Sequence, residues 1–186
     1  KKKRTIIPAD TRIQLMNYFE KNDPKMLIIC KLMYYSLLRP KEISMLKVEN
    51  VNFEKKAIFI PDTVSKNHKE RYATLTDDLI NDLQYIKEYK KNLFIFSSTM
   101  MPGTVRAHKD RYGKLWDKTK KHLNLRDEFQ LYSFRDTGIF EMLKSGIDPL
   151  TVKQHADHHS LEMTTLYSDH FDPNLNENIR AHAPKF

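Results

Sequence analysis

The run MLIICKLMYYSLL, from Met26 to Leu38, is the feature that most restricts how this chain can fold. It is apolar nearly all round a helix, and such a helix has to be buried on every side. Asp23 and Pro24 supply an N-cap and a first helical residue. The helix should stop at Arg39, because Pro40 disfavours helical dihedrals in the residue before it. The sequence therefore predicts a central buried helix.

The rest of the chain predicts a mainly α fold with a small antiparallel β-sheet insertion (α+β). Between Val48 and Thr74, the segments VENVNF, AIFI and RYATL have the composition of short strands joined by polar turns. Apolar residues at helical spacing lie on both sides of this insertion. Further helices are expected at Pro8–Glu20, from Pro40, around Leu79–Ile86, around Val105–Leu123, at Ser133–Lys144, from Asp148, from Ser160 and from Asp172.

Length and charge narrow the choice of function. At 186 residues the chain is long enough for one domain with a sizeable core and too short for two ordinary ones. Residues 1–186 are therefore expected to form a single domain. The chain has 32 Lys and Arg against 24 Asp and Glu, a net charge of +8. This excess favours an anionic partner, most commonly nucleic acid, and a merely solvated basic surface is the alternative.

The single cysteine, Cys30, lies inside the apolar run, so no disulfide framework is possible. A reducing compartment such as the cytoplasm is favoured. No apolar run approaches the ~18–20 residues needed to cross a bilayer, and no signal peptide is visible. We therefore expect no membrane partner.

A cluster of histidines near the C-terminal end raises the question of a metal site. His155, His158 and His159 would lie on one face of a continuous helix, where they could bind a metal ion. The interval does not read as one helix, however, and the only nearby residue of ligand type is Asp157. The sequence therefore favours a site without a metal or other cofactor.

Two other segments, taken together with this stretch, suggest phosphoryl transfer instead. LLRPKEISML places Arg39 and Glu42 three residues apart at a helix start, and LYSFRDTGIFEML places Arg135 in a first helical turn, where it could reach outward. Arginines grip phosphate oxygens with fork geometry and stabilise the charge of a pentacovalent state. Tyr167 follows His158 by nine residues and offers an oxygen nucleophile. Such a reaction needs no ATP, because the covalent link retains the energy of the broken phosphodiester.

These motifs resemble the catalytic domain of the tyrosine recombinase (phage integrase) family. LLRPKEISML is similar to the family's first arginine motif, and ADHHSLEMTTLY to its last motif, which ends in the nucleophilic tyrosine. SKNHKERYATL resembles the β-hairpin that carries the catalytic lysine, which matches Lys66 best, with Lys69 as a rival. The similarity runs in the right order over nearly the whole chain. The family's N-terminal core-binding domain is not in this sequence.

The resemblance implies a role for each matching residue. Tyr167 would attack the scissile phosphate, form a 3′-phosphotyrosyl link and release a 5′-hydroxyl. Arg39, Arg135 and His158 would bind the non-bridging oxygens. The substrate would be double-stranded DNA, and the protein would associate on it as a dimer or tetramer, at the nucleoid of a bacterial cytoplasm.

The resemblance also assigns supporting roles and shows three departures. Lys66 would protonate the leaving 5′ oxygen, and Glu42 would position the arginine and lysine side chains. Tyr132 stands where the family usually has a histidine. An unperturbed tyrosine has a pKa of about 10, so Tyr132 is a poor base, and we expect it to donate a hydrogen bond to the phosphate. Asp157 replaces a usual glycine, and Asp136 a frequent histidine.

Two other classes of function remain open at this point. A type IB topoisomerase-like enzyme would use the same nucleophile and relax supercoils without exchanging strands between partners. A DNA-binding module of the same fold would bind without cleaving.

Overall fold

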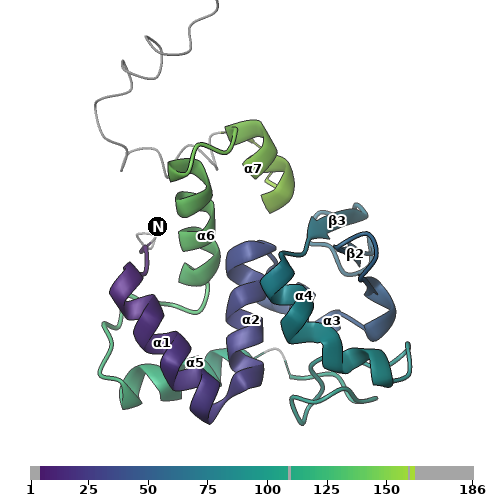
Figure 1. The fold of residues 1–186 in the computed structure, drawn as a ribbon, viewed down its shortest axis with the longest axis horizontal. Helices are drawn as coiled ribbons and strands as arrows, with labels where there is room; N and C mark the ends of the chain where they lie inside the picture. Colours follow the sequence, from purple (N-terminus) through teal and green to yellow (C-terminus); the bar gives the residue numbers. More distant parts are fainter. Residues whose placement is uncertain (1–4, 109, 159, 162–186) are drawn as a thin grey trace, which may run out of the picture.

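A computed structural model describes residues 5–108, 110–158 and 160–161 (Figure 1). The fold is mainly α with one small antiparallel sheet, as predicted. In chain order the elements are α1 Ala9–Asn22, α2 Pro24–Tyr35, α3 Pro40–Met45, the 3-10 turn η1 Val48–Asn50, β1 Val51–Asn52, β2 Ala57–Ile60, β3 Arg71–Thr74, α4 Asp77–Leu83, the 3-10 turn η2 Gln84–Glu88, α5 Arg111–His122, α6 Ser133–Lys144 and α7 Pro149–Ala156.

Helix α2 lies at the centre of the fold, with α1, α3, α4 and α6 packed against it. The Asp23 side chain caps it by accepting from the backbone N–H of Met26 at 3.1 Å, as its position before Pro24 predicted. Met26, Ile29 and other apolar residues of α2 are fully buried. Full burial of such a side chain stabilises the fold by about 1.5–3 kcal/mol.

Helix α2 carries Cys30, the one cysteine of the sequence. Cys30 is a free, buried thiol, and burial raises its pKa well above the ordinary value. It is therefore a packing residue and a poor nucleophile. Within the described residues, no helix is both long and apolar enough to cross a membrane.

The sheet pairs its strands in the order β1-β2-β3. Ile58 lies opposite Ala73, and Ile60 opposite Arg71. Side chains alternate between the two faces of a strand, so Arg71 points to the same face as the buried Ala73. A cation is thereby placed on the inward side of the hairpin.

Several predicted elements are shorter than expected. Helix α2 ends at Tyr35 and not at Arg39, because Leu37 has left-handed backbone dihedrals, with φ 51°, that a helix cannot include. The segment VENVNF contributes only β1, because the Asn50 side chain accepts from the Lys47 N–H at 2.8 Å and closes a 3-10 turn. The helix expected from Val105 begins only at Arg111. Residues before it are held extended by single bridges, such as the one between Ser97 and Arg106.

Helices α2 and α6 cross at backbone contact. A Cβ atom built on Gly138 of α6 would overlap the carbonyl oxygen of Tyr34 in α2. Only glycine permits this approach, which brings the first turn of α6 close to the end of the central helix.

We predict that Gly138→Ala destabilises the protein by at least about 1–3 kcal/mol, because the added methyl meets a backbone carbonyl that cannot move independently. Gly113→Ala in α5 is the matched control, since a Cβ there has no neighbour within 4 Å. That change should leave the free energy of unfolding unaltered or raise it by up to about 1 kcal/mol. Urea unfolding measures both, and equal effects would contradict the close crossing.

Candidate active site

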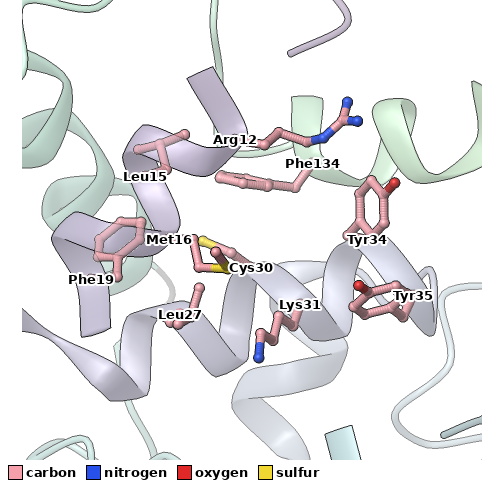
Figure 2. Close-up of a pocket in the computed structure, with 10 residues that line it drawn as sticks. All are labelled: Arg12, Leu15, Met16, Phe19, Leu27, Cys30, Lys31, Tyr34, Tyr35 and Phe134. Carbon is pink, nitrogen blue, oxygen red and sulfur yellow. The ribbon is translucent and has the colours of Figure 1, made fainter. Parts of the chain in front are cut away.

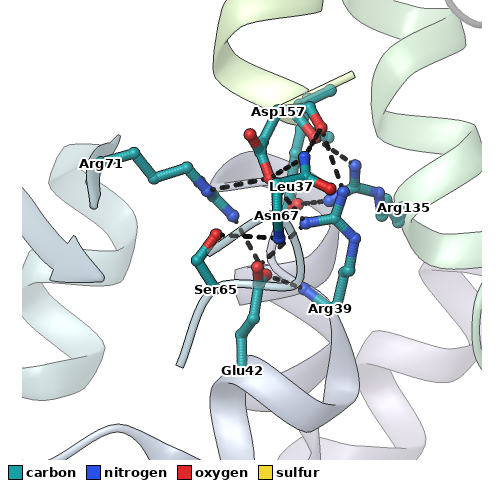
Figure 3. A network of polar contacts seen from close by, with 9 residues as sticks. Leu37, Arg39, Glu42, Ser65, Asn67, Arg71, Arg135 and Asp157 are labelled. Atoms are coloured by element: carbon teal, nitrogen blue, oxygen red, sulfur yellow. Dashed lines mark hydrogen bonds and ion pairs between the residues drawn. The ribbon is translucent and has the colours of Figure 1, made fainter. Parts of the chain in front are cut away.

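Three arginines converge where α3, the β2–β3 hairpin, α6 and α7 meet (Figure 3). Arg39 is the N-cap of α3, Arg71 begins β3, and Arg135 lies in the first turn of α6. Two carboxylates, Glu42 and Asp157, lie among them. We call these five residues the arginine cluster.

Glu42 is the buried anion on which Arg39 and Arg71 are oriented. Its side chain is 1% exposed and accepts three hydrogen bonds: from the Arg39 backbone N–H at 2.8 Å, Arg39 Nη1 at 2.9 Å and Arg71 Nη2 at 3.0 Å. The first of these is the capping contact that the three-residue spacing allows at a helix start. Loss of one partner from a buried ion pair typically costs about 3–5 kcal/mol, so the three groups are held as a unit.

Asp157 joins the end of α7 to the hairpin. It has left-handed backbone dihedrals, with φ 53°, a conformation that glycine favours and Asp or Asn tolerates. Its Oδ2 accepts from Arg39 Nη1 at 3.1 Å and from Asn67 Nδ2 at 2.8 Å. Its backbone carbonyl accepts from Arg39 Nη2 at 3.1 Å and Asn67 Nδ2 at 3.0 Å.

Arg135 does not reach outward as the sequence suggested. Its side chain is fully buried and donates to the carbonyl oxygens of Leu37 and Ala156. Leu37, with φ 51°, lies in the turn after α2, and Ala156 is the last residue of α7. Carbonyl groups at the end of a helix have no backbone N–H partner within that helix, and here the guanidinium takes the place of that partner. Burial lowers the pKa of Arg135 from its ordinary value, although an arginine stays charged in a protein.

Tyr132 lies beside the arginine cluster. It precedes α6, is 38% exposed, and has the Arg135 guanidinium carbon 5.8 Å from its ring centre. With Pro40 and Lys114 it lines an open hollow of about 450 Å³. Burial acts to lower the pKa of Arg39, but nearby Glu42, Tyr132 and Asp157 outweigh it and raise the pKa. Tyr132 therefore faces both solvent and the cationic side of the cluster.

The remaining predicted residues have different placements. Lys66 lies exposed in the loop between β2 and β3, next to Asn67, and its rival Lys69 is also exposed. His158 is buried directly after Asp157, and its backbone N–H donates to the Lys153 carbonyl at 3.1 Å. Tyr167 lies outside the described residues.

The histidine cluster is split between different positions. His155 Nε2 donates to the Tyr35 carbonyl at 2.8 Å and so ties α7 to the end of α2. His159 lies outside the described residues. Among the residues that the structure describes, no three His, Cys, Asp or Glu side chains are arranged to hold a metal ion.

Sequence reasoning missed Arg71 and Asn67. The signal for Arg71 was the strand RYATL, in which alternation puts an arginine on the face of an alanine and a leucine. A charge on the apolar face of a strand calls for a buried partner. Asn67 carried no such signal, because its contact with Asp157 joins residues 90 positions apart.

A second hollow lies between α1 and α2, and its lining is mainly apolar, unlike the charged arginine cluster (Figure 2). It encloses about 150 Å³ and is lined mainly by apolar side chains, including Met16, Phe19, Cys30 and Phe134. Arg12 closes one side and pairs with Glu141 at 3.0 Å. None of the predicted catalytic residues lines it, so we place the site at the arginine cluster.

The arginine cluster has the chemistry of an anion site. With three guanidinium groups against two carboxylates it retains a positive charge, and fork-shaped donors suit phosphate oxygens. A mainly α domain of this kind, with a small sheet that brings a basic hairpin to buried arginines, has the architecture of an integrase-type domain.

The comparisons with known proteins agree with that class. The family model described as "Phage integrase family" matches residues 6–173, and the chain belongs to this family. Tyrosine recombinase XerA of Pyrococcus horikoshii is 29% identical over 161 residues, which cover 82% of this chain and 53% of that protein. The chain spans about half the length of the curated relatives it matches.

Solved structures show the same fold. The catalytic domain of bacteriophage HP1 integrase has a TM-score of 0.71 and 20% identity, over 98% of this chain and 96% of its own. The Tn1549 transposon integrase, solved in complex with circular intermediate DNA, has a TM-score of 0.78 and 14% identity, over 97% of this chain and 67% of its own.

The partly buried His155 predicts how stability depends on pH. Burial foremost, and then Arg71 and Arg135, lower its pKa below the ordinary 6.5, against the opposing hydrogen bond to Tyr35. A histidine with a lowered folded pKa contributes stability above pH 6.5 that is lost as the pH falls below 6.5 towards the folded value. The free energy of unfolding should therefore fall between pH 7 and 5, and His155→Gln should make that fall shallower.

Urea unfolding at a series of pH values measures this effect, with a limit of about 1.4 kcal/mol per pH unit for one group. His108→Gln is the matched control, because the His108 side chain is 72% exposed. It should keep the wild-type slope. Parallel curves for wild type and His155→Gln would contradict the assignment.

Proposed function

We propose that this chain is the catalytic domain of a site-specific DNA recombinase that cleaves and rejoins strands through a 3′-phosphotyrosyl intermediate at Tyr167. The observation that carries the proposal is the convergence of three arginines, distant in sequence, in one cluster of a phage integrase family member. Arg39 and Arg71 bind the buried Glu42, and Arg135 binds the carbonyl two residues before Arg39. Residues 1–186 form this single catalytic domain.

The chemistry follows from the groups present. The Tyr167 hydroxyl attacks phosphorus, so a phenolic O–P bond forms while the bond to the 5′ oxygen breaks. The phenolic proton passes to His158 or to water, and Lys66 gives a proton to the leaving 5′ oxygen. Arg39, Arg135 and His158 stabilise the charge that gathers on the non-bridging oxygens. Rejoining is the reverse attack by a 5′-hydroxyl, so no cofactor supplies energy.

The burial of Arg135 refines its part in this scheme. Nη1 and Nη2 are engaged by the carbonyls of Leu37 and Ala156, and Nε has no hydrogen-bond partner among the described residues. Arg135 therefore supports the site through its charge and by fixing the two chain ends that carry Arg39 and Asp157.

The partner is double-stranded DNA, on which the protein assembles as a dimer or tetramer. The net charge of +8 supports an anionic partner. The solved Tn1549 integrase is a DNA complex, and a solved XerH recombinase is bound to its difH substrate. We place the protein at the nucleoid of a bacterial cytoplasm.

A nicked suicide duplex tests the nucleophile. We expect wild-type protein to form a covalent adduct and Tyr167→Phe to form none, because the substitution removes one hydroxyl and no positive charge. DNA binding by the variant, measured by fluorescence anisotropy, should stay close to wild type. The reaction should also proceed in EDTA, since the arginines neutralise the phosphate.

The outcomes separate the alternatives. An adduct with Tyr167→Phe would show that another residue attacks. Binding without any wild-type adduct would favour the non-catalytic module. Relaxed circles without joining of two different sites would favour the topoisomerase-like enzyme.

Tyr132→Phe tests the residue that replaces the family's usual histidine. It deletes the hydroxyl and keeps the ring beside Arg135. We expect strand cleavage to slow by about tenfold, the worth of a hydrogen bond to a charged group, with little change in melting temperature. Cleavage at the wild-type rate would mean that Tyr132 only packs against the helix.

A further inference from the structure

The carboxylate of Asp157 occupies the position that an anionic ligand of the arginine cluster would take. It lies 3.1 Å from Arg39 Nη1 and 2.8 Å from Asn67 Nδ2, with Arg71 Nε 3.8 Å away (Figure 3). These donors come from two segments, the start of α3 and the β2–β3 hairpin, and converge on one oxygen. A carboxylate and a phosphodiester each carry one negative charge and accept from the same donors.

Arg71 has donors to spare. Its side chain is 10% exposed, and Nη2 binds Glu42. Nε and Nη1 are buried and have no hydrogen-bond partner in the described part of the chain. Unpaired buried guanidinium donors are costly, and they favour an acceptor with more than one oxygen. The single oxygen of Asp157 at 3.8 Å does not meet that need.

We propose that Arg39, Arg71 and Asn67 form a binding site for a tetrahedral oxyanion, and that the Asp157 carboxylate fills this site until a phosphate group of DNA displaces it. Arg71 is then a further phosphate-contacting residue, and Asp157 sets how tightly the site binds. The identity of the oxyanion as a DNA phosphate rests on the proposed function.

The local geometry allows the displacement without unfolding. The backbone carbonyl of Asp157 separately accepts from Arg39 Nη2 and Asn67 Nδ2, at 3.1 and 3.0 Å. Those bonds hold the end of α7 in place while the side chain rotates away. A phosphodiester then presents the same single negative charge to the donors as the carboxylate that it displaces.

The same contacts explain why a carboxylate is tolerated in this position. Three arginines lie together here, and Arg39 and Arg71 both act to lower the pKa of Arg135. Asp157 offsets this repulsion while DNA is absent. The left-handed backbone at residue 157 admits Gly, Asn and Asp, so the carboxylate can be removed without straining the chain.

Calorimetric titration with inorganic phosphate, at ionic strength held constant with chloride, tests the proposal. We expect Asp157→Asn and Asp157→Gly to bind phosphate about ten to a hundred times more tightly than wild type, the range for removing one hydrogen-bonded charged competitor. Asp127→Asn is the matched control, because it removes the same charge from an exposed turn residue and should bind as wild type does.

Adding Arg71→Lys to Asp157→Asn tests the role of Arg71. The lysine keeps a positive charge beside Glu42 and removes the Nε and Nη1 donors, so the gain in phosphate affinity should largely disappear. Far-ultraviolet circular dichroism and melting curves establish that each variant is folded.

Equal phosphate affinity in wild type, Asp157→Asn and Asp157→Gly would overturn the proposal. A gain that Asp127→Asn reproduces would overturn it too, since general charge would then be the cause. A gain that survives Arg71→Lys would remove Arg71 from the site. Cleavage of the suicide duplex is scored separately. Loss of adduct in every protein would refute the recombinase function and leave the phosphate result standing.

Discussion

The rest of the site depends on the hydrogen bonds that the buried guanidinium of Arg135 donates. It binds the carbonyls of Leu37 and Ala156, which close the turn after α2 and the end of α7. Arg39 follows the first of these carbonyls by two residues, and Asp157 follows the second directly. One side chain therefore sets the spacing between two of the charged groups of the arginine cluster. The close crossing at Gly138 keeps its helix near enough for this to happen.

Much of the fold was predictable because local physics determines it. The all-round apolar run marked α2, the proline and aspartate residues marked its start, and the strand compositions marked β2 and β3. The short β1 and the late start of α5 were not predictable, since a side-chain turn at Asn50 and pairing between distant segments override local propensity.

The arginine cluster was predictable only in part. The contact between Arg39 and Glu42 could be predicted, because a spacing of three residues allows a capping contact at a helix start. Arg135 was found by motif, but its burial depends on carbonyls of two distant turns. Asn67 binds Asp157 and Arg71 binds Glu42. Contacts between residues so far apart in the chain produce no periodic pattern in the sequence. The charge balance of the site therefore depends on tertiary contacts and not on local sequence.

The bonds from Asn67 to Asp157 have a consequence for how such domains can be recombined in the laboratory. They hold the hairpin loop against the end of α7. The donor lies in the hairpin and its acceptor at the end of α7, although the two segments are far apart in the chain. A chimera that imports a relative's hairpin without the matching end of α7 would separate donors from their acceptor. Residues 67, 71 and 157 should therefore be exchanged as one module, and crossover points belong outside the segments that contain them.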